Sequence, residues 1–274
     1  MKPKEKLREK DLQRISRLRL IDDDFMTICF DGYIEGANLL LRLILQRDDL
    51  KIKEVKTQKA LKNLEGRDLR LDIYATDING AKYNIEIQRS DKGAIAQRAR
   101  YHSSMIDADM LMPGQKFDEL NTNIVIFITE KDVLGLDEPI YHIDRYIKEG
   151  NHLPFNDGSH IIYVNGEKKG SDTDLEKLMS DFYCTESKDM NYKELSDRVK
   201  YYKETKKGAE DMCQIWDEIR AEGREEGVQE GVLIGKEENA LRMIKLGKFS
   251  LEDIALSTDL PIGKIKELAE AKSA

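Results

Sequence analysis

The fold is decided by residues 71–88, which read LDIYATDINGAKYNIEIQ. Two segments in which apolar and polar residues alternate, 71–75 and 82–88, flank an Asn-Gly turn, and this pattern predicts a hairpin of two antiparallel strands. The aliphatic residues of each segment fall on one face, whereas Asp72 and Glu86 fall on the other. If the strands pair, the two carboxyl groups therefore share one face of the sheet.

The register of the hairpin depends on the length of its loop. A two-residue loop would set Ile73 against Glu86. We prefer a three-residue loop, residues 78–80, which places Asp72 directly across from Glu86 with their side-chain origins roughly 5 Å apart. Like charges so placed repel, and a bound cation would remove this penalty. The preferred register pairs Leu71 with Ile87, Ile73 with Ile85 and Ala75 with Tyr83.

An Asp and a Glu on neighbouring strands are also expected by chance, because the chain holds 53 Asp and Glu among its 274 residues. Most such pairs are solvated surface groups. From the hairpin alone, a solvated pair and a functional pair carry about equal weight, so the features around the hairpin must decide.

Length and composition allow one domain of ordinary size plus appendages, because 274 residues exceed the usual range of about 100–200 per domain. The net charge of −8 argues against a protein that coats nucleic acid over its whole surface. Residues 1–20, however, carry eight Lys or Arg against three acids. A basic arm of this kind can contact phosphates, with a solvated charged helix as the alternative.

The cysteines and the lack of long apolar segments indicate the compartment. Cys29, Cys184 and Cys213 are widely spaced and odd in number, which predicts a reducing environment and no zinc site. No segment is apolar over the length needed to span a bilayer, and the N-terminus has no signal-peptide pattern. We therefore expect a cytoplasmic protein without membrane contact.

The pattern of apolar residues predicts a body from about residue 21 to 170. Residues 123–128 are apolar on both faces, as expected for a central strand buried between helices. The order of elements predicts an α/β core, a mixed sheet flanked by helices. The predicted elements are a helix at 34–45, a strand at 50–55, the hairpin, a helix at 94–106, and strands at 123–128, 140–146 and 160–164.

Further motifs stand around the hairpin in a defined order. They are Asp24-Phe25 before the first helix, residues 70–73 (RLDI), residues 85–88 (IEIQ), residues 97–103 (QRARYHS), a turn at Gly114 and the strand at residues 124–128. This order resembles the PD-(D/E)xK nuclease superfamily, and in particular its branch of transposase-like, recombination-promoting nucleases found in bacteria. The resemblance implies a restriction-endonuclease-like core and metal-dependent cleavage of DNA, associated with recombination or transposition.

The resemblance also implies a set of metal ligands. Asp72 and Glu86 would bind the ion, and the backbone carbonyl of Ile87 would supply another oxygen. Hydrolysis of a phosphodiester needs charge neutralisation and an activated water, and Mg²⁺ prefers carboxylate oxygens plus retained waters. We therefore expect Mg²⁺ or Mn²⁺ as the cofactor. Glu35 is a candidate third acid, with a solvated helix glutamate as the alternative.

Gln88 stands where the signature of the superfamily has lysine, whose ammonium orients the attacking water and stabilises negative charge. An amide can hold a water by hydrogen bonds but carries no charge. Glu-x-Gln versions occur in this branch, so Gln88 does not by itself imply an inactive site, and Gln88→Lys should preserve or increase cleavage. The alternatives are a catalytically weak or inactive DNA-binding or assembly protein on the same fold, and a structural hairpin in an unrelated α/β domain.

The helix after the hairpin carries basic residues. Arg98 and Arg100 are candidate phosphate contacts, and pairing with local acids is an equal alternative. His102 is the only histidine nearby, and a lone histidine is more often structural than a general base.

The C-terminal tail differs in character from the body. Gly223, Gly227, Gly231 and Gly235 recur every four residues in a charged segment. Each glycine costs a helix about 1 kcal/mol relative to alanine, so we expect a paired helix in a homodimer. After Gly247, two short helices resemble a helix-turn-helix, with packing or oligomerisation as the alternative. The predicted organisation is a basic arm (1–20), a nuclease-like core (21–170), a helical extension (171–215) and a Gly-striped helix with a helix-turn-helix-like tail (216–274).

Overall fold

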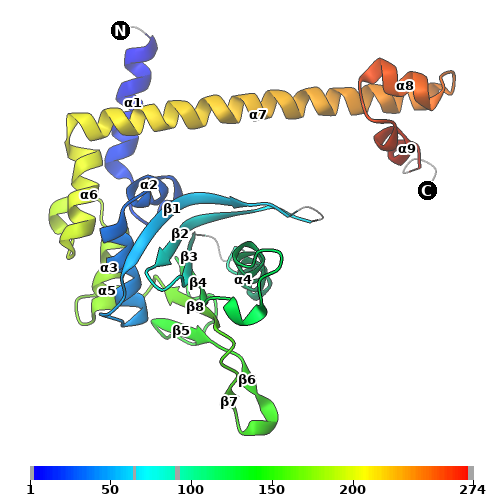
Figure 1. The fold of residues 1–274 in the computed structure, drawn as a ribbon. Helices are drawn as coiled ribbons and strands as arrows, with labels where there is room; N and C mark the ends of the chain where they lie inside the picture. The colour runs from blue at the N-terminus through cyan, green and yellow to red at the C-terminus, as the bar shows by residue number, and fades with distance from the viewer. Residues whose placement is uncertain (1–2, 64–65, 90–92, 271–274) are drawn as a thin grey trace. The chain divides into compact units, whose positions relative to one another are not determined.

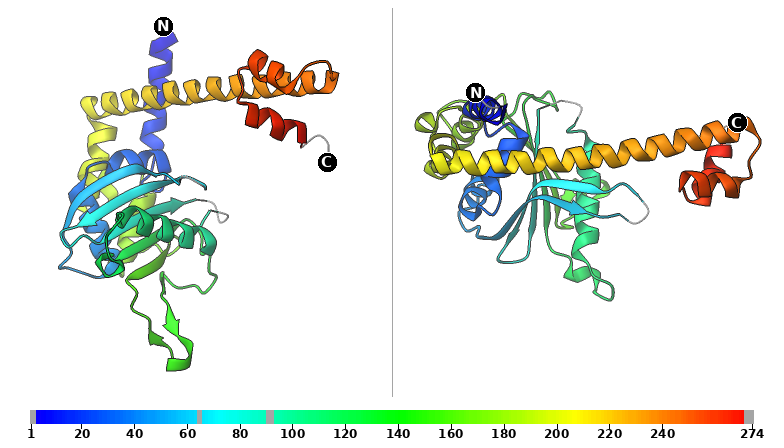
Figure 2. Two further views of the ribbon diagram at one scale, coloured as in Figure 1. Left: turned by 45° about the vertical axis from the view of Figure 1, so that its right-hand side comes forward. Right: turned by 90° about the horizontal axis from the view of Figure 1, so that it is seen from above.

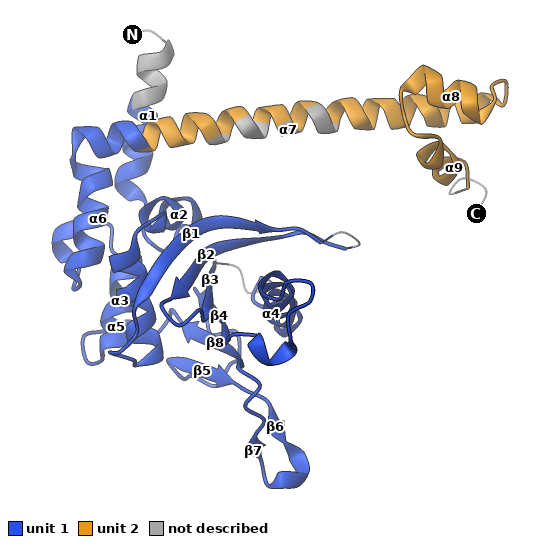
Figure 3. Ribbon diagram, viewed as in Figure 1, with its two compact units in different colours: residues 1–211 blue, residues 212–274 orange. Residues whose placement is uncertain are grey.

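The computed structural model describes residues 3–63, 66–89 and 93–270 (Figure 1). The chain divides into two compact units, residues 1–211 and 212–274 (Figure 3). The first two residues of the predicted basic arm lie outside the described residues, as do the side chains of residues 3–8.

A six-stranded mixed sheet forms the centre of the first unit, with the strand order β1-β2-β3-β4-β8-β5. β3, β4 and β8 are parallel to one another, whereas β1–β2, β2–β3 and β5–β8 are antiparallel. β4 is buried along its whole length, as its apolar sequence requires. The strands are β1 (Ile52–Leu61), β2 (Leu69–Asp77), β3 (Lys82–Gln88), β4 (Asn123–Thr129), β5 (Ile140–Ile143) and β8 (Ser159–Asn165).

Helices cover both faces of this sheet (Figures 1 and 2). α4 packs on one face, against Val125 and Phe127 of β4. α2 and α3 lie on the other face, and the predicted α/β core with a mixed sheet is therefore confirmed. The α-helices that lie wholly within this unit are α1 (Pro3–Arg17), α2 (Asp23–Phe30), α3 (Ile34–Leu45), α4 (Ala96–Met110), α5 (Asp174–Tyr183) and α6 (Lys193–Glu204).

The loop between β2 and β3 has the three-residue form. Asp77 N–H donates to the Ala81 carbonyl at 3.1 Å, and Gly80 takes the left-handed conformation with φ 92°. Asp77 Oδ1 accepts from the backbone N–H groups of Asn79 and Ala81, both at 2.9 Å, which fixes the turn. The predicted pairs of Ile73 with Ile85 and of Ala75 with Tyr83 are formed.

The β2–β3 ladder is shorter than predicted. It ends at Ile73–Ile85, so the expected pair of Leu71 with Ile87 is not part of it. The strands separate there because the side chains of Asp72 and Glu86 take over the hydrogen bonds.

Two other elements differ from the expectation. β1 continues to Leu61 as an edge strand whose outward positions carry lysines, a composition that suits an exposed edge. The strand expected at residues 140–146 ends at Ile143, and beyond it Asp144 contacts His160. The chain then forms a separate two-stranded ribbon of β6 (Tyr146–Ile147) and β7 (Leu153–Pro154).

The second unit consists of the C-terminal part of α7 (Lys206–Leu246) together with α8 (Leu251–Thr258) and α9 (Ile262–Glu270). The three helices share a small core of Ala240, Ile254, Leu260 and Ile265. Lys264, one of two lysines on the second helix of the helix-turn-helix-like tail, pairs with Glu237 at 3.3 Å. No helix in the described part of the chain is long and apolar enough to cross a membrane.

Candidate active site

Asp72 on β2 and Glu86 on β3 are joined by reciprocal hydrogen bonds. The Asp72 N–H donates to Glu86 Oε1 at 3.2 Å, and the Ile87 N–H donates to Asp72 Oδ2 at 3.1 Å. The side chain of Glu86 is 0 % exposed. The predicted convergence of these two carboxyl groups is therefore present, at the point where the backbone ladder ends.

The two carboxyl groups are buried beside one another, and this changes their acidity. Burial raises the pKa of Glu86, and the neighbouring Asp72 raises it further. Burial also raises the pKa of Asp72, followed in size by the effect of Asp23. In both groups burial and a neighbouring carboxyl group outweigh the opposite effect of Arg98, so the neutral form is favoured more than in water.

Asp23 in the first turn of α2 adds a third acid to this region. It lies close enough to Asp72 to raise the pKa of that carboxyl group. Burial and the adjacent Asp24 raise the pKa of Asp23, while Arg98 acts in the opposite direction. Asp23, Asp72 and Arg98 therefore interact at one place.

Glu35, the third acid expected from the sequence, lies elsewhere. It is exposed in the first turn of α3, where burial and Glu35 together raise the pKa of Tyr33. The run Asp22-Asp23-Asp24 at the start of α2 was the sequence signal for Asp23, but acids at a helix start are common because they suit its dipole.

The backbone of Ile87 faces β2. Its N–H donates to Asp72, whereas the carbonyl of the next residue, Gln88, accepts from the Glu130 N–H on the β4 side at 2.9 Å. Because successive carbonyl groups of a strand point in opposite directions, the Ile87 carbonyl points toward Asp72. This is the orientation that a metal-ligating carbonyl needs.

Arg98, near the start of α4, brings a cation to the carboxyl groups. Its Nη2 donates to Glu86 Oε2 at 3.0 Å, and its Nη1 donates to Gln88 Oε1 at 3.4 Å. The Arg98 side chain is 37 % exposed, so it also reaches solvent. Arg100 is two residues further along the helix, about 200° around it, and is exposed. The structure therefore does not bring the two arginines together.

His102 forms a hydrogen bond with Arg98 on the buried side of the guanidinium. Burial, followed by the charges of Arg98 and Arg67, lowers the pKa of His102 to about 3, so the ring is neutral. Its Nε2 accepts from Arg98 Nε at 3.2 Å, and the ring packs on Phe127 with 5.7 Å between centroids. The ring is thus buried and neutral, and its contacts are with Arg98, Asn84 and Phe127.

Gln58 on β1 is a site residue that no sequence pattern indicated. Gln58 lies opposite Asp72 in the β1–β2 ladder, because Thr57 pairs with Ile73 and Lys59 pairs with Leu71. Its backbone is left-handed, with φ 50°. Such a conformation costs a non-glycine residue on the order of 1–3 kcal/mol. The Gln58 side chain forms hydrogen bonds to Thr27 and Asp72, and the latter stabilises the charged carboxylate.

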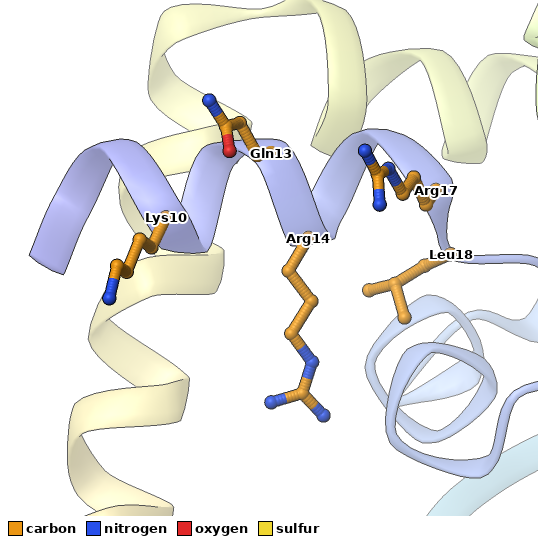
Figure 4. Close-up of a pocket in the computed structure, with 5 residues that line it drawn as sticks. All are labelled: Lys10, Gln13, Arg14, Arg17 and Leu18. Atoms are coloured by element: carbon orange, nitrogen blue, oxygen red, sulfur yellow. The ribbon is translucent and has the colours of Figure 1, made fainter.

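A group of basic side chains lies on one face of α1 and lines a cavity of about 300 Å³ (Figure 4). Arg14 also pairs with Asp24 at 3.4 Å, one residue from Asp23. The cations therefore lie next to the acidic start of α2. Ile15, on the same helix, is buried and packs α1 against the rest of the first unit. The residues that line the cavity are Lys10, Gln13, Arg14, Arg17 and Leu18.

The donor set suits a divalent metal ion with retained waters. Among the described residues, no three His, Cys, Asp or Glu side chains form a metal-binding group on their own. Mg²⁺ is usually held by one or two carboxylates and keeps several waters. Two buried carboxyl groups with raised pKa values, which share the single nearby guanidinium of Arg98, match this requirement.

A family model described as PD-(D/E)XK nuclease family transposase matches residues 38–183, which is more than half of the chain. The chain therefore belongs to this family, and its core has the α/β restriction-endonuclease-like fold. The matched region includes Asp72, Glu86, Gln88 and Arg98, whereas Asp23 precedes it. No curated protein and no solved structure matches the chain.

Proposed function

We propose that this protein is a metal-dependent DNA endonuclease associated with recombination or transposition. The observation that carries the proposal is the pair of buried carboxyl groups of Asp72 and Glu86, which exchange hydrogen bonds with backbone N–H groups at the end of a strand ladder. Membership of the nuclease family supports this assignment independently.

Asp72, Glu86 and the Ile87 carbonyl would hold Mg²⁺ or Mn²⁺, and Asp23 is the nearest candidate for a third acid. When bound, the ion would neutralise the phosphoryl oxygens and lower the pKa of a bound water. In the hydrolysis, the water oxygen forms a bond to phosphorus and the bond from phosphorus to one sugar oxygen breaks. The departing sugar oxygen takes up a proton, so the reaction adds one water overall.

Gln88 and the basic residues have separate roles in this proposal. The Gln88 amide orients the attacking water. Arg98 and Arg100 on α4, together with the cations of α1, contact the DNA backbone through phosphates, which need no particular base sequence. The Arg14–Asp24 pair supports a continuous path from α1 to the carboxyl groups.

Nicking of supercoiled plasmid in Mg²⁺ or Mn²⁺ tests the proposal, with Asp72→Asn as the matched control. The amide keeps an oxygen for the Ile87 N–H but removes the charge. We expect nicking by the parent, none by the variant, and none by either in EDTA. DNA binding without nicking by the parent would instead favour a weak or inactive binding protein, which the uncharged Gln88 makes the second candidate.

We also propose that the second unit forms a homodimer through the glycines of α7. An added Cβ at Gly227, Gly231 or Gly235 would meet no atom within 4 Å in the single chain. Val228 and Val232 beside them are 61 % and 54 % exposed. A second copy of the helix would cover these side chains and use the close approach that glycine permits.

The remaining features of the organisation stay proposals. They are the division into a basic arm (1–20), a nuclease core (21–170), a helical extension (171–215) and a tail (216–274), and a location in the bacterial cytoplasm. The shared core of α7, α8 and α9 and the Lys264–Glu237 pair favour packing over DNA binding as the role of the last two helices.

A further inference from the structure

Arg98 is held by three side chains, and two of them belong to the candidate active site. We propose that the Arg98 guanidinium supplies at Gln88 the positive charge that lysine carries in the signature of the family. This inference rests on the proposed nuclease function and assigns Arg98 a role beyond contact with DNA phosphates.

The geometry places the charge where the missing ammonium would be. Arg98 Nη1 lies 3.4 Å from Gln88 Oε1, and Nη2 lies 3.0 Å from Glu86 Oε2. A lysine at position 88 would project from the same backbone position and face the same carboxylate. Because Gln88 uses its oxygen toward Arg98, its amide N–H₂ stays available to orient a water. Charge and water-holding are thus divided between two side chains.

Buried residues fix the position of the Arg98 guanidinium through hydrogen bonds. Its Nε donates to Nε2 of His102, so the proton of the neutral ring is on Nδ1. Nδ1 lies 3.0 Å from the side-chain amide of Asn84. The Asn84 oxygen is buried and has no hydrogen-bond partner among the described residues. The Asn84 amide also forms a hydrogen bond to Glu86, so Arg98, His102, Asn84 and Glu86 form one buried cluster around the guanidinium.

Gly93 permits the approach of Gln88 to Arg98. An added Cβ at this glycine would lie 1.8 Å from Gln88 Oε1. The Gly93 carbonyl also accepts from Arg98 Nη1 at 3.4 Å. Any larger residue at position 93 would displace Gln88, so this close contact depends on the glycine.

Moving the charge back to position 88 tests the inference. Arg98→Met should lower metal-dependent nicking about 10²-fold or more, the scale of losing one stabilising group. Gln88→Lys alone should also lower nicking, because the new ammonium group and the Arg98 guanidinium would repel each other. The double variant Gln88→Lys/Arg98→Met should recover to within about tenfold of the parent. Arg47→Met is the control for loss of a surface cation, because Arg47 pairs only with the exposed Asp49 among the described residues.

A second readout needs no metal and no activity. In EDTA, urea unfolding should show each single variant destabilised, by about tenfold or more in the folding equilibrium for Arg98→Met, which leaves buried Glu86 without its partner. The double variant should regain most of this loss, because the lysine introduced at position 88 replaces the cation. If Arg98→Met does not fold, Arg98→Lys in the same scheme keeps a charge and should retain partial nicking.

The two readouts separate the two proposals. Compensation in stability with no nicking by the parent would retain the charge relationship and remove the nuclease function. Additive losses in the double variant, in stability and in nicking, would show that Arg98 does not act at position 88. Gln88→Lys with raised activity and no dependence on Arg98 would overturn the inference as well.

Discussion

The side chains of Asp72 and Glu86 form the hydrogen bonds that the backbones of β2 and β3 stop forming at this point. The Asp72 N–H donates a hydrogen bond to the Glu86 carboxyl group, and the Asp72 carboxyl group accepts one from the Ile87 N–H. The carboxyl groups are therefore oriented by strand backbone as well as by the side chains of Arg98 and Gln58. Groups held in this way need little rearrangement before they bind an ion.

Replacing either carboxyl group by its amide should abolish metal-dependent cleavage and leave the fold intact. Asp72→Asn removes a charged ligand but keeps an oxygen for the Ile87 N–H. Glu86→Gln removes the other and keeps an oxygen for one of its two donors, the Asp72 N–H or Arg98. Since the parent carries two repelling buried charges, Asp72→Asn should also match or exceed it in stability at pH 8 without metal. Nicking assays and urea unfolding of the same preparations measure both effects, and retained cleavage by either variant would remove the site assignment.

The stability of the metal-free protein should fall as the pH rises from about 5 to about 8. The pKa of Asp72 is raised to about 6 and that of Glu86 to about 8, above their values in the unfolded chain. In this window the folded state binds more protons than the unfolded state, so stability is lost on raising the pH.

Urea unfolding at several pH values, with and without Mg²⁺, checks this slope. The double variant Asp72→Asn/Glu86→Gln should show a flatter profile between the same pH values. Added Mg²⁺ should stabilise the parent more at pH 8 than at pH 5, because protons compete with the ion. A parent and a double variant with the same pH profile would contradict the raised pKa values.

DNA affinity should depend on salt through the cations of α1. Each residue among Lys10, Arg14 and Arg17 that contacts a phosphate should flatten the log–log salt slope by about 0.9 when changed to Gln. Substitution is preferable to deletion of residues 1–20, because Ile15 and Leu20 are buried and are part of the core. Fluorescence anisotropy over a salt series measures the slope. An unchanged slope in the triple variant would place phosphate binding elsewhere.

Gly93→Ala should lower nicking about tenfold or more while changing stability little. The added methyl group would meet Gln88 Oε1 at 1.8 Å, and the flexible Gln88 side chain would turn away from Arg98. Gly263→Ala, where the added carbon meets nothing within 4 Å, is a comparison for the substitution itself. Full activity of Gly93→Ala would show that the Gln88–Arg98 contact is dispensable.

Glycine substitutions on α7 should distinguish a paired helix from a single one. Leucine at Gly227, Gly231 and Gly235 together would keep two helices apart, so we expect loss of the dimer in sedimentation analysis. In a single helix, the same change would raise helix stability, because each leucine is a better helix former by about 1 kcal/mol at most. A monomeric parent would remove the dimer proposal.

The sequence predicted the parts of the site that follow from strand alternation. The faces of Asp72 and Glu86 and the three-residue loop are set by local pattern and by Gly80, and the structure has both. The contact between Arg98 and Gln88 could not be predicted from the sequence, because it depends on how α4 packs across β3. The same holds for Asp23, which reaches Asp72 from a helix far away in sequence.

The expectation for Gln88→Lys changes for the same reason. From the sequence, lysine at position 88 restores a missing cation and should preserve or increase cleavage. In the structure, the Arg98 guanidinium already donates to Gln88. A lysine there would meet a like charge, so the single substitution should help only when Arg98 is removed.

The turn that Asp77 closes constrains how the chain can vary in length. Side chains alternate between the two faces of a strand, so one extra residue in this turn would shift β3 by an odd step. Glu86 would then point to the face covered by α2 and α3, and Ile85 and Ile87 would take its place under α4. An insertion of two residues keeps the parity and leaves the faces unchanged. Insertions of an even number of residues in this turn thus preserve the site, and odd ones disrupt it. The turn has this effect although it contacts neither Asp72 nor Glu86.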